Sequence, residues 1–391
     1  MTDHKESKSV LFFSSDDWES GLKTSKYHMA CCLATDGYTV LYVNSIGLRQ
    51  PRFSTGIVRK IIGRLRGIFR GVRCVQQNIH VLTPFVIPFH RHAIVNRLNR
   101  FLLVMMVRWY QWRLGLRRPE LWVFLPNHAD IIGAFDERLS LYYCVDEHTL
   151  FEGVDVNTMR SLENRLIRGV DLLVVTARSL SASKGPQAKS VFYLPHGVDV
   201  DHFRKALDPG LPIPADVAAL PHPIVGFFGL IEEWIDLDMI ALAARQHPEW
   251  SFVMLGKAAV DVTPYSGISN LHFLGAKSFA DLPAYCKAFD CAMLPFKITD
   301  MTIHVNPLKM REYLAAGLRV VSSDLPEVRE LAPPIRIAGN RGEFAEEIER
   351  ALDQPLDRTS TTRLMDNDSW AGRYQMLRAE IERLVIAKAR S

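Results

Sequence analysis

The stretch HVNPLKMREYLAAGLRVVSS, residues 304–323, decides the fold more than any other part of this 391-residue chain. Asn306 is a good helix N-cap and Pro307 suits the first helical position, so the sequence predicts a helix that begins here and ends at Gly317. The apolar run that follows predicts a strand over 319–322. A loop, a helix and a buried strand in this order are typical of an α/β fold with a parallel sheet.

The first turn of this predicted helix is a candidate anion site. Free backbone N–H groups and the positive end of the helix dipole attract anions, and Lys309 adds a full charge, so a diphosphate would be held well there. Glu312, in the second turn, could accept hydrogen bonds from two vicinal ribose hydroxyls. The alternative is an amphipathic helix whose Glu312 is solvated, and the spacing alone does not separate the two.

The same alternation of short apolar runs and helical periodicity extends along most of the chain. It predicts strands in the N-terminal half at 10–13, 39–43, 121–124, 141–145, 172–175 and 190–194. In the C-terminal half it predicts strands at 224–228, 252–255, 271–274, 291–294 and 319–322, with helices from about Asp236, Phe279 and Pro307. We therefore predict two doubly wound, Rossmann-like α/β domains.

A proline-rich segment, DPGLPIPADVAALPHP at 208–223, holds five of the 21 prolines and predicts a linker. We accordingly expect an N-terminal domain over 1–203, a C-terminal domain over 204–368, and a final helix over 369–391 that packs back on the first domain. Ligands of open α/β sheets bind beyond the carboxyl ends of the strands, so we expect the chemistry in a cleft between the domains.

Composition excludes several classes of protein. A hydrophobic content of 48% with 23% charged residues excludes a mainly disordered chain. The six cysteines lack zinc-like spacing and favour a reducing cytoplasm. The polar N-terminus does not resemble a signal peptide, and no apolar run is long enough to span a bilayer. Neither a Walker A motif, a G-x-S-x-G elbow nor a metal-ligand spacing is present.

Charge is distributed unevenly. Between Asp36 and Glu120 there is no acidic residue, and 49–118 carries fifteen lysines and arginines although the whole chain has a net charge of only +4. The stretch 49–73 predicts a basic amphipathic helix suited to an anionic lipid surface. The segment 91–118 could be a second helix of this membrane-binding kind. It could equally be a helix that faces the core and has a solvated basic face. Nucleic acid would use the same charge, yet no recognised binding module accompanies it.

Four segments, in order, resemble the GT-B glycosyltransferases of retaining family 4 and the related bacterial exopolysaccharide and teichuronic acid glycosyltransferases. They are LPHGVDVDHF at 194–203, IVGFFGLIEEWIDLDMI at 224–240, FLGAKSFADLPAYCKAFDCAMLPF at 273–296 and the opening stretch at 304–323. The resemblance implies a GT-B fold and a nucleotide-sugar donor, preferably a UDP-sugar, as co-substrate. It implies no other cofactor and no required metal, because a helix end and lysines can stabilise a diphosphate leaving group.

The resemblance places the donor site in the C-terminal domain. It implies that Glu312 holds the ribose, that the helix start holds the diphosphate, and that backbone groups near 276–278 meet the base. The donor-binding candidates are Gly229, Lys257, Ala276, Lys277, His304, Asn306, Pro307, Leu308, Lys309 and Glu312.

This sequence departs from the family pattern at two places. His304 stands where the family's E-x7-E motif has its first glutamate. The family's Arg and Lys after the glycine turn are absent as well, because Gly229 is followed by LIEEW. Lys257 and Lys309 are the nearest candidates to supply the missing charge.

In the acceptor-side N-terminal domain, the catalytic candidates are Asp17, His128 and Asp146, each of which follows a predicted strand. Asp16 could replace Asp17, and both are equally ordinary turn residues. His128 resembles the family's cleft histidine, although a lone loop histidine is more often structural.

These features predict a retaining hexosyltransferase that moves a sugar from a nucleotide diphosphate to a lipid-linked or growing bacterial polysaccharide. We expect it in the cytoplasm, bound peripherally to the anionic inner face of the plasma membrane through 49–73, with no nucleic-acid partner. Two alternatives stay open: a nucleotide-sugar 2-epimerase, which shares the fold, and a non-catalytic GT-B scaffold subunit, which the departures from the family motif would suit.

Overall fold

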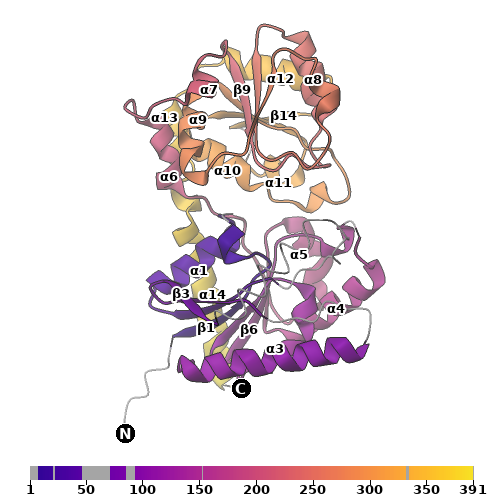
Figure 1. Ribbon diagram of the computed structural model, residues 1–391, viewed down its shortest axis with the longest axis vertical. Helices are drawn as coiled ribbons and strands as arrows, with labels where there is room; N and C mark the ends of the chain where they lie inside the picture. The colour runs from indigo at the N-terminus through magenta and orange to yellow at the C-terminus, as the bar shows by residue number, and fades with distance from the viewer. Residues whose placement is uncertain are drawn as a thin grey trace. The chain divides into compact units, whose positions relative to one another are not determined.

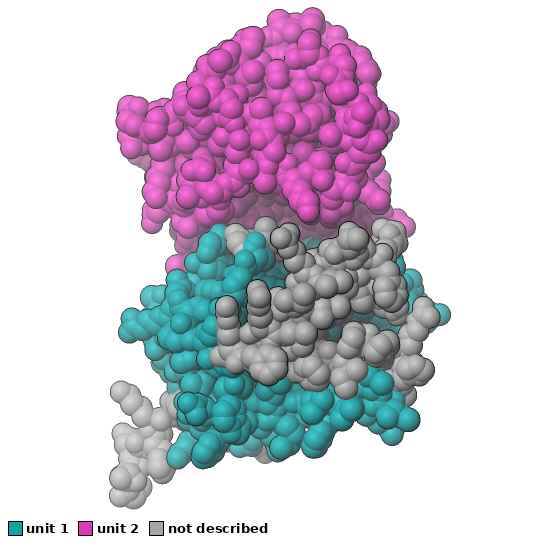
Figure 2. All heavy atoms as spheres, viewed as in Figure 1, with its two compact units in different colours: residues 1–194, 374–391 teal, residues 195–373 magenta. Residues whose placement is uncertain are grey.

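The computed structural model describes residues 8–20, 23–45, 71–84, 93–151, 153–331 and 334–390. The chain forms two compact units, shown in different colours in Figure 2. Unit 1 comprises Met1–Leu194 and Tyr374–Ser391, and unit 2 comprises Pro195–Arg373. Each unit is built on a sheet of its own flanked by helices (Figure 1).

Unit 1 contains an eight-stranded sheet with the strand order β3-β4-β2-β1-β5-β6-β7-β8. Every neighbouring pair is parallel except β3 and β4, which form an antiparallel pair at one edge. The strands are β1 (Ser9–Phe13), β2 (Thr39–Val43), β3 (Arg73–Gln76), β4 (Ile79–Leu82), β5 (Glu120–Val123), β6 (Leu139–Cys144), β7 (Leu172–Val175) and β8 (Val191–Tyr193).

The central strands β1, β5, β6 and β7 are buried along their whole length, as expected for a parallel sheet covered on both faces. The α-helices of this unit are α1 (Ser25–Thr35), α3 (Ala93–Arg113), α4 (Val156–Gly169), α5 (Arg178–Lys184) and most of α14 (Trp370–Arg390). The 3₁₀ helices are η1 (Trp18–Ser20), η2 (Pro126–Ile131), η3 (His148–Leu150) and η4 (Gly185–Gln187).

Helix α14 is tied to unit 1 through a buried charge network. The Arg378 guanidinium donates to both carboxylate oxygens of Glu120, at 2.9 and 2.8 Å, and to the Tyr38 hydroxyl at 2.6 Å. Arg138 donates to the same carboxylate at 2.7 Å. Because Glu120 is fully buried, these bonds replace the water that its charge has lost. The last helix of the chain therefore completes the core of the first unit.

Unit 2 contains a six-stranded parallel sheet with the order β11-β10-β9-β12-β13-β14. The strands are β9 (Ile224–Phe228), β10 (Ser251–Leu255), β11 (Leu271–Gly275), β12 (Cys291–Leu294), β13 (Arg319–Ser323) and β14 (Ile335–Ala338). The α-helices are α6 (Val200–Arg204), α7 (Ala215–Ala218), α8 (Leu237–Gln246), α9 (Leu282–Ala288), α10 (Leu308–Ala315), α11 (Pro326–Arg329), α12 (Glu343–Asp353) and α13 (Arg358–Arg363). The 3₁₀ helices are η5 (Lys205–Leu207), η6 (Thr263–Tyr265), η7 (Phe279–Asp281), η8 (Thr302–His304) and η9 (Asp366–Asp368).

The predicted α/β class and the predicted parallel strands are confirmed, with boundaries that differ by at most two residues. The sequence did not predict β3, β4 or β14. Strand β3 has no buried residue, and β14 has only four residues of which two are partly exposed, so neither shows the continuous apolar run of a central strand.

Most of the basic stretch 49–73 lies outside the described residues, so the helix predicted there stays a prediction. The segment 91–118 contains α3, a single helix of 21 residues. Among the described helices, none combines the length and the apolar character that crossing a bilayer requires.

Candidate functional site

A glycine turn follows each of the neighbouring strands β9 and β10 of unit 2. Gly229 has φ +139° and Gly256 has φ +156°. A Cβ atom on Gly256 would lie 1.7 Å from the Gly229 carbonyl oxygen, and a Cβ on Gly229 would lie 2.0 Å from Cε of Lys309. Both positions therefore require glycine, and the Lys309 side chain crosses directly over the turn at the carboxyl end of β9.

The predicted N-cap of helix α10 is wrong. Pro307 occupies the cap position, the helix begins at Leu308, and no side chain caps it. The amide of Asn306 is buried instead, where it donates to Glu327 at 2.7 Å and accepts from Arg311 at 2.6 Å. Because these charged partners occupy both ends of the amide, Asn306 supports the loop before the helix, and no side chain of the described residues caps the first-turn N–H groups.

Lys309 and Glu312 lie one turn apart on α10, and the pKa values of both are shifted by their surroundings. Glu312 is 8% exposed, and its burial raises the pKa of the carboxyl to about 7; the Lys309 charge opposes this shift and Asp199 adds to it. Burial likewise lowers the pKa of Lys309, and Glu312 opposes that change. An ammonium and a carboxylate held this far from water bind anions and hydroxyls more strongly than exposed groups do.

The other predicted donor residues of unit 2 have varied surroundings. Lys257 is exposed just after the second glycine turn, and Ala276 is exposed after β11. Lys277 donates to Asp216 at 2.6 Å and lies over the Tyr285 ring, so its charge is already paired. His304 ends η8, and its buried Nδ1 has no hydrogen-bond partner among the described residues.

The structure thus brings Gly229, Lys309 and Glu312 together at one edge of the unit 2 sheet. Leu308 is half-buried in the first turn of the same helix. A residue that the sequence did not predict, Tyr313, supports this edge: its hydroxyl accepts from the backbone N–H of Phe228 at 2.9 Å, at the end of β9. Its apolar neighbours in the sequence identify it only as a core residue.

In unit 1, the loop after β1 and the loop after β6 bring a second charged group together. Asp16 accepts from Thr24 at 2.7 Å and lies 3.7 Å from Nζ of Lys26, which is buried in the first turn of α1. Burial raises the pKa of Asp146, the Lys26 charge lowers it, and the Asp16 charge raises it further. Asp17 is exposed.

Asp16 and Lys26 are therefore the better supported members of this unit 1 group, together with the predicted Asp146. Asp16 was the alternative to Asp17 in the sequence. Lys26 lies in a helix whose periodicity gives no sign that its ammonium turns toward the sheet.

His128 is buried in η2, where its ring lies 5.1 Å from that of Phe13. Burial lowers the pKa of the imidazole to about 4, so the ring is neutral at physiological pH. Its Nδ1 has no hydrogen-bond partner within the described structure. A neutral ring can donate or accept a hydrogen bond there, but it does not serve as a cation near pH 7.

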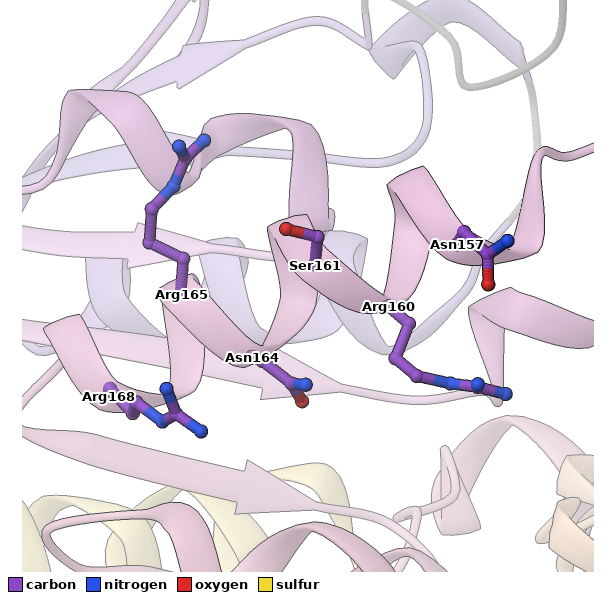
Figure 3. A pocket seen from close by; sticks show the side chains of 6 residues that line it. All are labelled: Asn157, Arg160, Ser161, Asn164, Arg165 and Arg168. Carbon is purple, nitrogen blue, oxygen red and sulfur yellow. The ribbon is translucent and has the colours of Figure 1, made fainter.

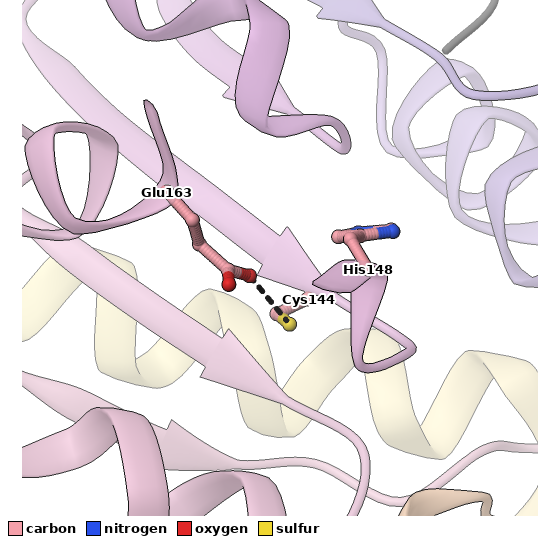
Figure 4. A group of neighbouring side chains, drawn as sticks. All are labelled: Cys144, His148 and Glu163. Atoms are coloured by element: carbon pink, nitrogen blue, oxygen red, sulfur yellow. Dashed lines mark hydrogen bonds between the residues drawn. The ribbon is translucent and has the colours of Figure 1, made fainter. Parts of the chain in front are cut away.

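A buried cluster lies behind these residues in unit 1. Cys144, His148 and Glu163 offer ligand atoms within 4.8 Å of one another (Figure 4). However, the Lys184 ammonium donates to Glu163 at 2.6 Å and contacts Glu147 at 2.8 Å. Burial lowers the pKa of His148 to about 3. Lys184 therefore already pairs with both carboxylates, and the cluster is part of a buried ion-pair network.

An open surface hollow of about 540 Å³ lies elsewhere on unit 1, along helix α4 (Figure 3). Its lining comes from one helix: Asn157, Arg160, Ser161, Asn164, Arg165 and Arg168. Arg165 pairs with Asp130 at 2.7 Å, and both side chains are about half exposed. None of the predicted site residues lines this hollow.

Comparisons with known proteins bear on the fold and on the family of unit 2. Residues 222–354 match the family model described as Glycosyl transferases group 1. A Bacillus subtilis (strain 168) protein named as a teichuronic acid biosynthesis glycosyltransferase, TuaH, is 31% identical over 144 residues, which are 35% of this chain. That match spans 36% of the relative's own length.

Solved structures match nearly the whole chain. Sucrose-phosphate synthase from Thermosynechococcus elongatus superposes with a TM-score of 0.69 at 14% identity, covering 97% of this chain and 100% of that one. Anabaena HepE in complex with UDP and glucose gives 0.64 at 14% identity, covering 95% and 99%. The predicted GT-B fold is confirmed, and residues 222–354 of this chain match the glycosyl transferases group 1 family.

Proposed function

We propose that this protein is a glycosyltransferase that transfers a sugar from a nucleotide-diphosphate donor, preferably a UDP-sugar, to a carbohydrate acceptor. The observation that carries the proposal is that Lys309 and the buried Glu312 lie one turn apart at the start of α10, which no described side chain caps, with Lys309 over the Gly229 turn. The structures and the curated relative described above support it as members of the same fold or domain family.

The roles of the residues follow from their chemistry. The first-turn N–H groups of α10 and the Lys309 ammonium would bind the diphosphate and stabilise the charge that develops as it leaves. The ionised Glu312 would accept hydrogen bonds from the ribose hydroxyls. Backbone groups around Ala276 would contact the base of the nucleotide. His304 would lie on the sugar side, where its imidazole could form a hydrogen bond with a sugar hydroxyl.

The experiment that tests the donor site is calorimetric titration of UDP, GDP and ADP into the wild type and Glu312→Gln. We expect one nucleotide to bind, and the substitution to weaken it by about 1.5–3 kcal/mol, the scale of a hydrogen bond to a charged group. Glu349→Gln, on the exposed side of α12, is the matched control. Equal nucleotide affinity in the wild type and both variants would show that Glu312 does not contact the nucleotide. The absence of nucleotide binding to the wild type would favour the non-catalytic scaffold.

For unit 1, we propose that Asp146 and the neutral His128 contact the sugar or the acceptor, with Asp17 or Asp16 on an acceptor hydroxyl. A retaining outcome would let the leaving phosphate accept the acceptor proton, so no dedicated base is required. We also propose that transfer requires no divalent metal. Turnover that persists in EDTA supports this, and turnover that EDTA abolishes and Mg²⁺ restores contradicts it.

The acceptor that we propose is a lipid-linked or growing bacterial polysaccharide, met at the cytoplasmic face of the membrane. The support is the basic stretch 49–73, whose charge suits anionic lipid. Analysis of the products separates the alternatives. Incorporation of the donor sugar into a membrane fraction supports transfer, whereas a new nucleotide sugar formed from the donor alone would identify a 2-epimerase.

A further inference from the structure

Helix α3 has two apolar faces, and only one of them is used by the core of unit 1. Leu103 and Val107 are buried in the core that covers the sheet. The opposite face carries an apolar stripe at spacings of three and four residues, which places its members in one row along the helix. This stripe consists of Ile94, Leu98, Phe101, Met105, Trp109 and Trp112.

The stripe is strongly exposed. Ile94 is 81% exposed, Phe101 60% and Trp112 78%. Figure 1 shows α3 running along the outside of unit 1. Single exposed apolar residues are ordinary, but six in a continuous row along 21 residues form a surface that excludes water when it meets a partner.

The charge beside the stripe has one sign. Arg97, Arg100, Arg108 and Arg113 are exposed on the flanks of the helix, and α3 contains no acidic residue. A row of apolar side chains with arginines beside it is the pattern of a helix that lies in the boundary of an anionic bilayer, where the arginines meet phosphates and the apolar row enters the acyl region. Tryptophans are favoured at that boundary.

A basic hollow at the C-terminal end of α3 provides a second observation. It has a volume of about 620 Å³, and Arg108, Trp112, Arg117 and Arg118 line it together with one acid, Asp136. The Arg108 Nε is committed to the Ala134 carbonyl at 2.7 Å, which orients its guanidinium. Three arginines beside a tryptophan suit a phosphate group whose attached chain is apolar.

We propose that α3 is an interfacial helix that lies on an anionic phospholipid surface, with the stripe in the headgroup boundary and the hollow at its end on a lipid phosphate. A second copy of the chain fits less well, because stacking two stripes would bring two rows of arginine together. Nucleic acid fits less well too, because it offers no counterpart to a long aliphatic row. The inference goes beyond the donor chemistry proposed above and does not depend on it.

The test is flotation of the full chain with vesicles of phosphatidylcholine alone and of phosphatidylcholine with phosphatidylglycerol. We expect binding to the anionic vesicles that falls with added salt. The triple variant Phe101→Gln/Trp109→Gln/Trp112→Gln removes exposed stripe residues and should lose at least tenfold in binding. The matched control, Leu242→Gln/Leu364→Gln/Ile386→Gln, replaces exposed apolar residues elsewhere and should bind as the wild type does.

Lipids brominated on the acyl chain measure how deeply the stripe tryptophans enter the bilayer. We expect the brominated lipids to quench tryptophan emission in the wild type, and we expect Trp109→Phe/Trp112→Phe to lose most of that quenching while it still floats. Full flotation of the stripe variant, or unchanged quenching in the phenylalanine variant, would overturn the proposal. Residues 49–73 would then be the remaining candidate for contact with the membrane. The proposal would also be overturned if the wild type did not float with anionic vesicles, or if it dimerised through the stripe.

The nucleotide titration is performed on the same stripe variant. Unchanged nucleotide affinity together with lost flotation assigns the stripe to lipid and leaves the donor site intact, so failure of one proposal is distinguishable from failure of the other.

Discussion

At the scale of single residues, Glu312 shows how binding and stability oppose each other. Its carboxyl is buried and has a pKa of about 7, against 4.5 for an ordinary glutamate. The folded state therefore holds a proton more tightly than the unfolded state does between these two values. The contribution to stability is fully present below pH 4.5 and is lost as pH rises through 7, a cost of roughly 3 kcal/mol.

Glu312→Gln is accordingly expected to stabilise the protein at alkaline pH while it weakens nucleotide binding. At pH 8 the free energy of unfolding should rise by about 1–3 kcal/mol relative to the wild type, and at pH 5 the difference should be small. Urea unfolding at the two pH values measures this. A variant that is less stable than the wild type at pH 8 would show that Lys309 compensates the buried charge fully.

The glycine at the end of β9 is the second residue whose identity the site requires. In Gly229→Ala the new methyl group would overlap Lys309 Cε, and φ +139° would be strained for alanine. We expect Lys309 to be displaced and nucleotide affinity to fall at least tenfold. Gly267→Ala is the control, because a Cβ there meets nothing within 4 Å. Calorimetry on both variants, with circular dichroism to verify folding, decides the point.

The sequence predicted that Lys309 and Glu312 lie one turn apart on a helix, because helix periodicity fixes how such residues are placed, and their role in binding stays a prediction. It misassigned Asn306, since capping preference is local whereas the buried Arg311 and Glu327 that engage the amide come from α10 and α11. Lys26 was missed for the same reason: its partner Asp16 precedes it in a loop whose path depends on tertiary packing.

At the scale of elements, buried strands were predictable and edge strands were not. Strands such as β9 and β12 are continuous apolar runs because both sheet faces are covered. The β3–β4 pair is antiparallel and edge-located, and the exposed pattern of β3 resembles a loop in sequence. The periodicity of α3 was ambiguous because the helix has an apolar stripe on two faces, of which the core uses only one.

Helix α14 depends on the bond between Arg378 and Glu120. In Arg378→Met the Glu120 carboxylate stays buried with Arg138 and Trp122 as its remaining partners. We expect a loss of about 3–5 kcal/mol in the stability of unit 1. Arg383→Met, on the same helix but 62% exposed and paired with Glu380, should cost less than about 1 kcal/mol. Equal losses in the two variants would mean that helix propensity rather than the buried pair holds α14.

At the scale of the whole molecule, the chain passes from unit 1 to unit 2 and returns for its last helix. Ending the chain after Arg373 removes Arg378 and also Tyr374, whose hydroxyl donates to Asp36 at 2.7 Å. We expect calorimetry to show a lowered or absent unit 1 transition, while UDP still raises the melting temperature of unit 2. Simultaneous loss of both transitions would show that unit 2 does not fold without the first unit.

The returning helix also sets an order of events during synthesis. Glu120 emerges from the ribosome long before Arg378 is translated, so the sheet of unit 1 is made early but its buried carboxylate has only Arg138 as a charged partner among the described residues until α14 is made. Unit 2 is continuous in sequence and can complete its core first. We therefore expect the unit whose strands are translated first to finish folding last, and a chain released before α14 is made would carry a folded unit 2 beside an unfinished unit 1.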